Sequence, residues 1–153
     1  MKMKLYPPFV VLPFIGIIIV SSYYLLPPVK IFSITTIIGS LMILLALIIF
    51  VKASRAIKKH KTTIFPDGVP SFLVKTGVFK YSRNPIYLAM ILLMVGVSIV
   101  CKNLPGFIFP AIFYSWIQKR WIFEEERNLK KAFGKQFLEY ASNTRRWISI
   151  FKK

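Results

Sequence analysis

Polar side chains that could do chemistry gather in Lys80-Tyr-Ser-Arg-Asn-Pro-Ile-Tyr87, where a hydrophobic segment begins. A second polar cluster, Glu124-Glu-Glu126, stands where the next hydrophobic segment ends, and it holds three of the five acidic residues of the chain. Polar groups beside a hydrocarbon phase cost free energy, so their presence needs a reason. If both clusters lie at one membrane face, their side chains form one site with both signs of charge.

The composition predicts an integral membrane protein. Of the 153 residues, 56% are hydrophobic and 16% aromatic, which is too apolar for an ordinary soluble domain. The net charge of +17, from 22 Lys and Arg against 5 Asp and Glu, raises the possibility of nucleic-acid binding. The basic residues stand beside apolar runs, however, so anionic membrane lipids are the expected counterions and no nucleic acid is expected.

The cysteine and histidine content limits the chemistry. Cys101 is the only cysteine, which excludes an intrachain disulfide, and it is expected to pack as a small hydrophobic residue. His60 is the only histidine and lies in a basic stretch without a nearby carboxylate or thiol. We therefore expect no zinc or other metal site.

Four apolar segments predict an all-α membrane domain with four transmembrane helices. Each is long enough, or nearly so, to cross the hydrocarbon core. Pro85 suits the first turn of the third helix, because its missing N–H would have no partner there, and Pro27-Pro28 is expected to end the first. The expected spans are residues 9–26, 31–51, 85–101 and 105–123.

The loop charges predict the orientation. The connection between the second and third spans carries eight of the basic residues, whereas the other two connections carry Lys30 and Lys102 alone. Lys and Arg favour the cytoplasmic side, so both termini are expected in the cytoplasm, with the protein in an inner or cytoplasmic membrane. Oligomeric state does not follow from these patterns.

The two non-spanning segments have distinct expected roles. Residues 52–84 mix turn formers with aromatic and aliphatic residues, which favours a cap folded over the site rather than a solvated linker. Residues 124–153 repeat apolar residues at helical spacing, which favours an amphipathic tail helix at the cytoplasmic interface. Gly134 is expected to mark a kink or a close approach within that tail, and residues 147–151 to anchor its end at the headgroups.

The same two clusters resemble a known family. Thr76-Gly-Val-Phe-Lys-Tyr-Ser-Arg-Asn-Pro-Ile-Tyr-Leu88 is similar to the "T-G-x-[YF]-x-x-[ST]-R-[NH]-P-x-Y" signature of the isoprenylcysteine carboxyl methyltransferase and phospholipid methyltransferase group. Glu125-Glu126 with the Leu, Phe-Gly and Tyr that follow, then Arg146-Trp147, resembles the tail signature of that group. Two motifs in order are far more specific than one. Phe137 replaces the usual tyrosine. Ala89 stands where glycine is common and Asn84 where the isoprenylcysteine enzymes have histidine, and these last two departures bear on the substrate more than on the reaction.

The resemblance implies methyl transfer from S-adenosylmethionine. The donor carboxylate is expected at Arg83, its ammonium or ribose hydroxyls at Glu125 and Glu126, and its sulfonium against the π face of Tyr81 or Tyr87. The protein then mainly positions two partners and excludes water, without a covalent nucleophile. The residues expected to bind the donor are Tyr81, Arg83, Asn84, Pro85, Tyr87, Leu88, Glu125 and Glu126.

The acceptor is expected to be a hydrophobic, lipid-like or prenylated molecule. A carboxylate acceptor needs no base, and Arg146 would orient it. An amine acceptor must lose a proton, and a glutamate or Tyr87 would then assist. The expected catalytic residues are Arg146, Asn84 and Tyr87.

Other interpretations remain open. Taken singly, Arg83 suits a positive-inside belt, the three glutamates a solvated helix end, and the tyrosines interfacial anchors. Membrane reductases that use a nicotinamide dinucleotide phosphate share a similar C-terminal half, and a non-catalytic lipid-binding protein could keep the same fold. Only the joint occurrence of both motifs, in order, favours a methyltransferase.

Overall fold

The computed structural model describes residues 7–25, 33–60 and 70–149, and the regular elements in those ranges are all helical. The chain divides into two compact units. The first unit comprises residues 1–47 and 89–116, and the second comprises residues 48–88 and 117–153. The all-α expectation is confirmed for the part of the chain that is described.

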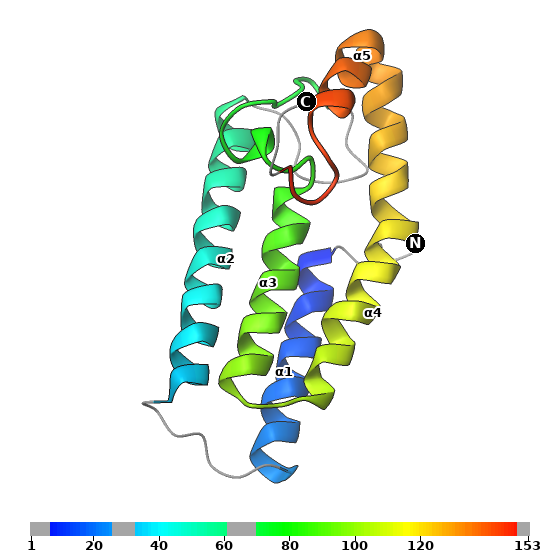
Figure 1. Ribbon diagram of the computed structural model, residues 1–153. Coiled ribbons are helices and arrows are strands. Elements are labelled where there is room, and N and C mark those ends of the chain that lie inside the picture. Colours follow the sequence, from blue (N-terminus) through cyan, green and yellow to red (C-terminus); the bar gives the residue numbers. More distant parts are fainter. Residues whose placement is uncertain (1–6, 26–32, 61–69, 150–153) are drawn as a thin grey trace. The chain divides into compact units, whose positions relative to one another are not determined.

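The helices begin and end as follows. They are α1 (Pro7–Leu25), α2 (Ile34–Lys59), α3 (Pro85–Val100), α4 (Ile108–Ile117) and α5 (Phe123–Asn143), and Figure 1 traces them in sequence order. Short 3₁₀ turns cover Gly77–Lys80 and Pro105–Phe107, and a π-helical turn covers Gln118–Ile122.

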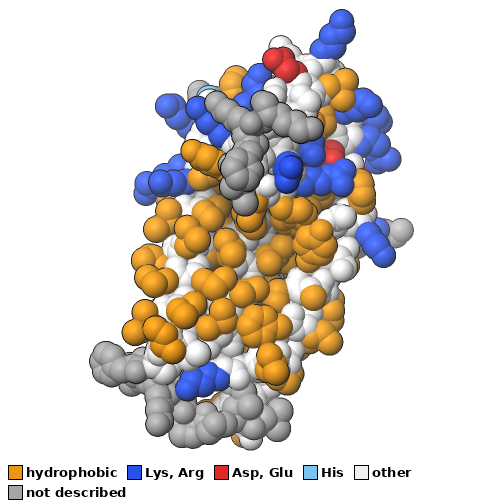
Figure 2. Space-filling view, in the orientation of Figure 1, with side chains coloured by type: hydrophobic (Ala, Val, Ile, Leu, Met, Phe, Trp, Pro, Cys, Tyr) orange, Lys and Arg blue, Asp and Glu red, His pale blue; other side chains and the backbone are white. Residues whose placement is uncertain are grey.

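α1 and α2 are long and apolar enough to cross a membrane. Only 22% of the most apolar 18-residue stretch of α1 and 11% of that of α2 are buried. The core helix of a soluble protein would be mostly buried. Large side chains such as Phe9 and Ile34 are exposed, and hydrophobic side chains cover the visible face of the first unit (Figure 2). This surface suits lipid rather than water and indicates an integral membrane protein. α3 is also apolar but shorter, at 16 residues.

Two glycines allow α2 and α3 to approach closely within the first unit. A Cβ atom on Gly39 would lie 2.8 Å from both the carbonyl oxygen of Gly96 and the backbone nitrogen of Val100. A Cβ atom on Gly96 would lie 2.8 Å from the side chain of Ile43. The contact therefore depends on two missing side chains, a common device between helices in membranes.

Asn103 ties α1 to the turn between α3 and α4. Its Nδ2 lies 3.1 Å from the carbonyl oxygen of Ile18 and 2.9 Å from the hydroxyls of Ser21 and Ser22. Its Oδ1 accepts a 2.8 Å hydrogen bond from the backbone N–H of Gly106. A buried amide with partners on both ends holds this end of the unit together at little net cost.

The helix bounds correct several expectations. α2 continues to Lys59 instead of stopping at residue 51, so the start of the expected 52–84 cap is helical. Lys58 and Lys59 occupy its last turn, where cations favour the helix dipole. Pro85 begins α3 as expected. Residues 26–32, 61–69 and 150–153 lie outside the described residues, and with them Pro27-Pro28, Lys30, part of the cap and the end of the expected headgroup anchor.

The backbone helix continues past residue 123, where the fourth expected span ends and the expected tail helix begins. The π-helical turn joins α4 to α5 without leaving helical φ and ψ at Ile117, Ile122 or Phe123. The change from apolar to polar sequence at Glu124 is therefore not a break in the helix. Gly134, with φ 49° and ψ −118°, kinks α5 as expected, while no atom lies close enough to indicate a close approach.

The apolar residues of α5 pack within the second unit. Phe137 and Tyr140 form a buried cluster with Leu73, and Leu129 and Phe133 pack against it. Leu73 comes from the expected cap, so the described part of this segment does fold onto α5. Part of the apolar face of α5 is therefore covered by the chain itself, while Phe123 of that face is 49% exposed.

We expect Gly39→Ala to lower the apparent melting temperature in detergent by several degrees, because the new methyl group meets backbone atoms that cannot move independently; overpacking of this kind typically costs about 1–3 kcal/mol. Gly16→Ala is the matched control, since nothing lies within 4 Å of a Cβ atom built on Gly16. Equal melting temperatures for the two variants would show that α2 and α3 do not depend on this contact.

Candidate functional site

A turn and the start of α3 present the first half of the site. Ser82 and Asn84 are buried, and the Ser82 hydroxyl accepts a 3.1 Å hydrogen bond from the backbone N–H of Asn84. The Asn84 carbonyl accepts the Leu88 N–H at 3.0 Å in the first turn of α3. This local bonding fixes the backbone on both sides of Arg83 and directs Tyr87 from the first turns of the helix.

Residues 144–149, which we call the strap, present a further part of the site. The strap follows α5 directly, and its first residue, Thr144, is extended, with φ −130° and ψ 126°. The Arg83 N–H donates to the Arg145 carbonyl at 3.0 Å, and the Ser149 N–H donates to the Tyr81 carbonyl at 2.7 Å. Figure 1 shows this red segment beside the green turn that precedes α3. The strap therefore carries Arg146 to the site.

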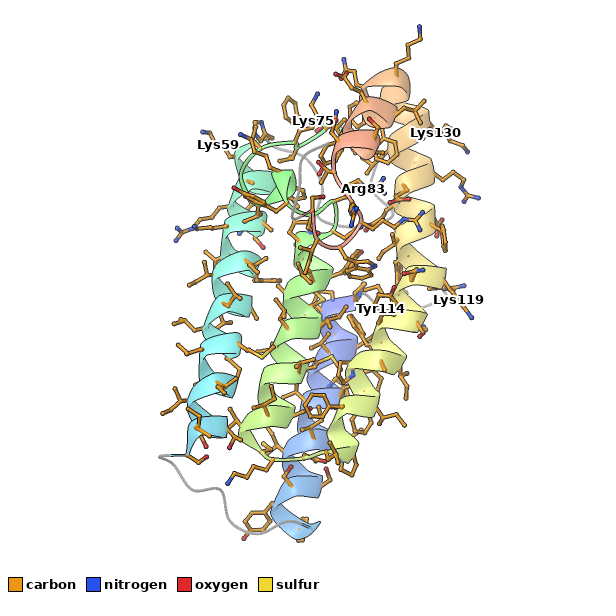
Figure 3. All side chains as sticks on the ribbon, viewed as in Figure 1. Lys59, Lys75, Arg83, Tyr114, Lys119 and Lys130 are labelled. Carbon is orange, nitrogen blue, oxygen red and sulfur yellow. The ribbon has the colours of Figure 1, made fainter. Side chains whose placement is uncertain are left out.

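Glu126 lies between two guanidinium groups. Its Oε2 is 2.7 Å from Nη2 of Arg146, and the Arg146 Nε donates to the same carboxylate at 3.0 and 3.1 Å. Its Oε1 is 3.2 Å from Nη1 of Arg83. Figure 3 labels Arg83, whose side chain is directed toward α5 within this unit. The paired bonds from Arg146 have the fork geometry that makes such ion pairs strong.

The ion cluster is largely removed from water. The Arg83 and Glu126 side chains are each only 14% exposed. Burial lowers the pKa of Arg83, Glu126 opposes that effect, and Arg146 adds to it. The buried Nε of Arg83 has no hydrogen-bond partner among the described residues. The cluster therefore holds two cations, one anion and one spare donor.

Aromatic rings line the two guanidinium groups. The Arg146 Cζ lies 4.6 Å from the centroid of the Phe123 ring, and the Arg83 Cζ lies 5.9 Å from that of Phe137. These are cation–π distances, and the rings also shield the charges from water. Phe137, which replaces the usual tyrosine of the motif, thus retains the aromatic face.

Glu125 has a different environment from its neighbour. It accepts a 2.6 Å hydrogen bond from the hydroxyl of the buried Tyr87. Burial raises the pKa of Glu125 to about 7; the Tyr87 hydrogen bond opposes the rise, and the charges of Glu126 and Glu124 add to it. Adjacent helical residues point about 100° apart, which explains why the two carboxylates reach different partners.

The structure brings together most of the expected site. Contacts link Arg83, Glu126, Arg146 and Asn84, and a second contact pairs Tyr87 with Glu125, the neighbour of Glu126 in the chain. Pro85 is buried at the start of α3, and the partly buried Leu88 contacts this set only through its backbone N–H on the Asn84 carbonyl. Tyr81 is 66% exposed, so its side chain lies outside the set.

Two contributors were missed by the motif analysis. Ser82 bonds to the strap, and Phe123 lies under Arg146. The serine is part of the [ST]-R-[NH]-P signature, so the hydroxyl residue of that signature was the available signal. The sequence contains no such signal for Phe123, because Arg146, which it contacts in the structure, is remote in sequence.

The sequence matches the phospholipid methyltransferase family over residues 34–136, more than half of the chain. The chain belongs to this family. The match covers Arg83, Tyr87, Glu125 and Glu126 and ends before Arg146.

Curated relatives carry related names. Protein-S-isoprenylcysteine O-methyltransferase of Saccharomyces cerevisiae is 31% identical over an alignment of 134 positions, and the match covers 76% of this chain and 52% of the relative. Protein-S-isoprenylcysteine O-methyltransferase B of Arabidopsis thaliana is 33% identical over 70 residues, 45% of this chain and 35% of the relative. The chain thus spans about half the length, or less, of these relatives.

We expect Glu126→Gln to destabilise the protein, because two partly buried guanidinium groups lose their anion. The sequence had suggested a surface carboxylate with little effect on folding, and its burial corrects that expectation. Removing one partner of a buried ion pair costs about 3–5 kcal/mol, and we expect about 2–4 kcal/mol for this partly exposed one. Thermal unfolding in detergent measures the loss. The control is Glu139→Gln on the exposed face of α5, which should leave the melting temperature unchanged.

We expect Glu125 to make stability depend on pH. Folding raises its pKa from 4.5 to about 7, so the folded protein binds more protons than the unfolded one between these values. Stability contributed by Glu125 is therefore full below about pH 4.5 and is lost as pH rises through 7. Melting temperatures measured across this interval should fall less steeply in Glu125→Gln than in the wild type. Parallel curves would contradict the raised pKa, and Glu139→Gln should keep the wild-type slope.

Proposed function

We propose that the protein is an integral membrane methyltransferase that uses S-adenosylmethionine to methylate a hydrophobic acceptor. The observation that carries the proposal is the Glu126 carboxylate held between Arg83 and Arg146, next to the Tyr87–Glu125 pair. These residues come from both family motifs. Membership of the phospholipid methyltransferase family and the names of the two relatives support the same reaction class.

The residues present fit the chemistry of the donor. Its carboxylate suits the guanidinium group of Arg83, whose Nε is a buried donor without a partner among the described residues. Its ammonium suits Glu125 or Glu126, and its sulfonium suits a π face such as that of Tyr87. When bound, the donor supplies an electrophilic methyl group. The residues of this chain bind and orient the partners and exclude water.

The acceptor assignment follows from placement. α1 and α2 present lipid-compatible surfaces, and we propose that the 85–101 and 105–123 segments complete four membrane spans with both termini in the cytoplasm. A lipid-like or prenylated acceptor then enters from the bilayer, while the polar donor enters from the cytoplasm. If the acceptor is a carboxylate, Arg146 would orient it. If it is an amine, Glu125, with a pKa of about 7, suits acceptance of its proton.

Donor titration tests the proposal. Purified protein in lipid nanodiscs should bind S-adenosylmethionine in calorimetry with a Kd in the micromolar range usual for cofactors, on the order of 1–100 µM, and should bind NADPH at least tenfold more weakly. Glu125→Gln should weaken donor binding, whereas the exposed Glu139→Gln should not.

Methyl transfer separates an enzyme from a binding protein. Tritium from methyl-labelled donor should enter the organic phase when membrane lipid extract or a prenylated cysteine is supplied. Binding without transfer to either class would indicate a non-catalytic lipid-binding protein. Tighter binding of NADPH than of the methyl donor would overturn the proposal in favour of a reductase.

A further inference from the structure

One backbone carbonyl of the strap accepts hydrogen bonds from two buried side chains. The Ser82 hydroxyl lies 3.1 Å from the carbonyl oxygen of Arg146, and Nδ2 of Asn84 lies 3.1 Å from the same oxygen. Ser82 is 2% exposed and Asn84 is 8% exposed. Because a carbonyl oxygen has two lone pairs, the two donors satisfy it completely.

The donors are themselves fixed in position. The Ser82 hydroxyl accepts the N–H of Asn84 at 3.1 Å, so its own hydrogen is available for the Arg146 carbonyl. The neighbouring backbone bonds between Arg83 and Arg145 and between Ser149 and Tyr81 hold the strap on either side. These main-chain hydrogen bonds position residue 146 independently of the contacts that its side chain makes.

This carbonyl belongs to the residue whose guanidinium holds Glu126. The Arg146 side chain reaches the carboxylate at 2.7 Å, a contact that tolerates little displacement of the backbone from which it starts. The Asn84 amide donates to the main chain of the strap at 3.1 Å and not to either carboxylate of the described site.

We propose that Ser82 and Asn84 are positioning residues that act through the main chain of Arg146. The catalytic consequence rests on the proposed methyl transfer, whereas the structural consequence does not. The sequence motif predicts that Asn84 touches the donor. In this proposal, Asn84 instead positions the Arg146 guanidinium against the Glu126 carboxylate. An asparagine or histidine at this point can donate to a carbonyl, and aspartate cannot at neutral pH.

Limited trypsin digestion tests the positioning directly. Cleavage between Arg145 and Arg146 requires release of the strap, and cleavage after the exposed Lys130 of α5 provides an internal reference. Loss of one hydrogen bond worth about 1.4 kcal/mol should raise the released population, and so the relative cleavage rate, by about tenfold. We expect this for Ser82→Ala and Asn84→Asp. Asn84→His, which keeps a donor, should cleave within about threefold of wild type.

Asn143→Asp is the matched control. Asn143 also donates through Nδ2 to a carbonyl, that of Glu139 at 3.0 Å, but it is exposed and distant in sequence from the turn. It should leave cleavage after Arg145 unchanged. Mass spectrometry of early digestion products reports both rates on the folded protein in nanodiscs.

Kinetics of methyl transfer provide the second measurement. In Asn84→Asp we expect kcat to fall about tenfold while KM for the donor changes less than about threefold, with Asn84→His restoring kcat. Unchanged Arg145 cleavage in both folded Asn84→Asp and Ser82→Ala would overturn the positioning role, as would failure of Asn84→His to differ from Asn84→Asp. If the wild type neither binds nor uses the methyl donor, the proposed function fails while the cleavage result still decides the positioning role.

Discussion

The second unit is organised by the need to hold Glu126 away from water between two arginines. Taking one carboxylate and two guanidinium groups partly out of solvent costs several kcal/mol for each ion, and only short, well-directed contacts offset such a cost. The 2.7 and 3.2 Å contacts to Arg146 and Arg83 provide them. Arg83 precedes Glu126 by 43 positions and Arg146 follows it by 20, so segments on both sides of Glu126 must fold back to it.

Three features of the backbone follow from that requirement. The π-helical turn Gln118–Ile122 precedes the glutamates, and its wider winding changes which face of α5 they occupy. Gly134 turns the remainder of α5 so that Phe137 and Tyr140 can pack on Leu73, and the Tyr140 hydroxyl donates to the Phe79 carbonyl at 2.7 Å. The strap then leads back to the turn before α3. Together, the π-helical turn, the kink at Gly134 and the strap bring the charged residues of the second unit into contact.

The sequence predicted which polar residues lie near one another better than it predicted their individual contacts. Motif order correctly joined Arg83, Tyr87 and the two glutamates, and Pro85 and Gly134 marked a helix start and a kink through their backbone constraints. The burial of Glu126 was missed because its arginine partners are remote in sequence. The contacts of Ser82 and Asn84 were missed for another reason: their partner is a backbone carbonyl, which every residue possesses and which therefore leaves no mark in the sequence. The length of α2 was underestimated because hydropathy stops at Val51, whereas helical bonding continues through exposed lysines.

The two neighbouring glutamates of this short motif lie in different environments. Glu126 contacts two guanidinium groups, whereas Glu125 accepts a hydrogen bond from a tyrosine hydroxyl in a buried setting that raises its pKa to about 7. Their separation of one helical step is sufficient, because it directs them to different neighbours. Near neutral pH the cluster of Arg83, Arg146, Glu125 and Glu126 therefore carries a net charge between 0 and +1, depending on one proton at Glu125. An acceptor carboxylate would find compensating charge there without any proton transfer. An ammonium acceptor would first have to give up its proton, and Glu125 is the group whose pKa allows it to take one at physiological pH.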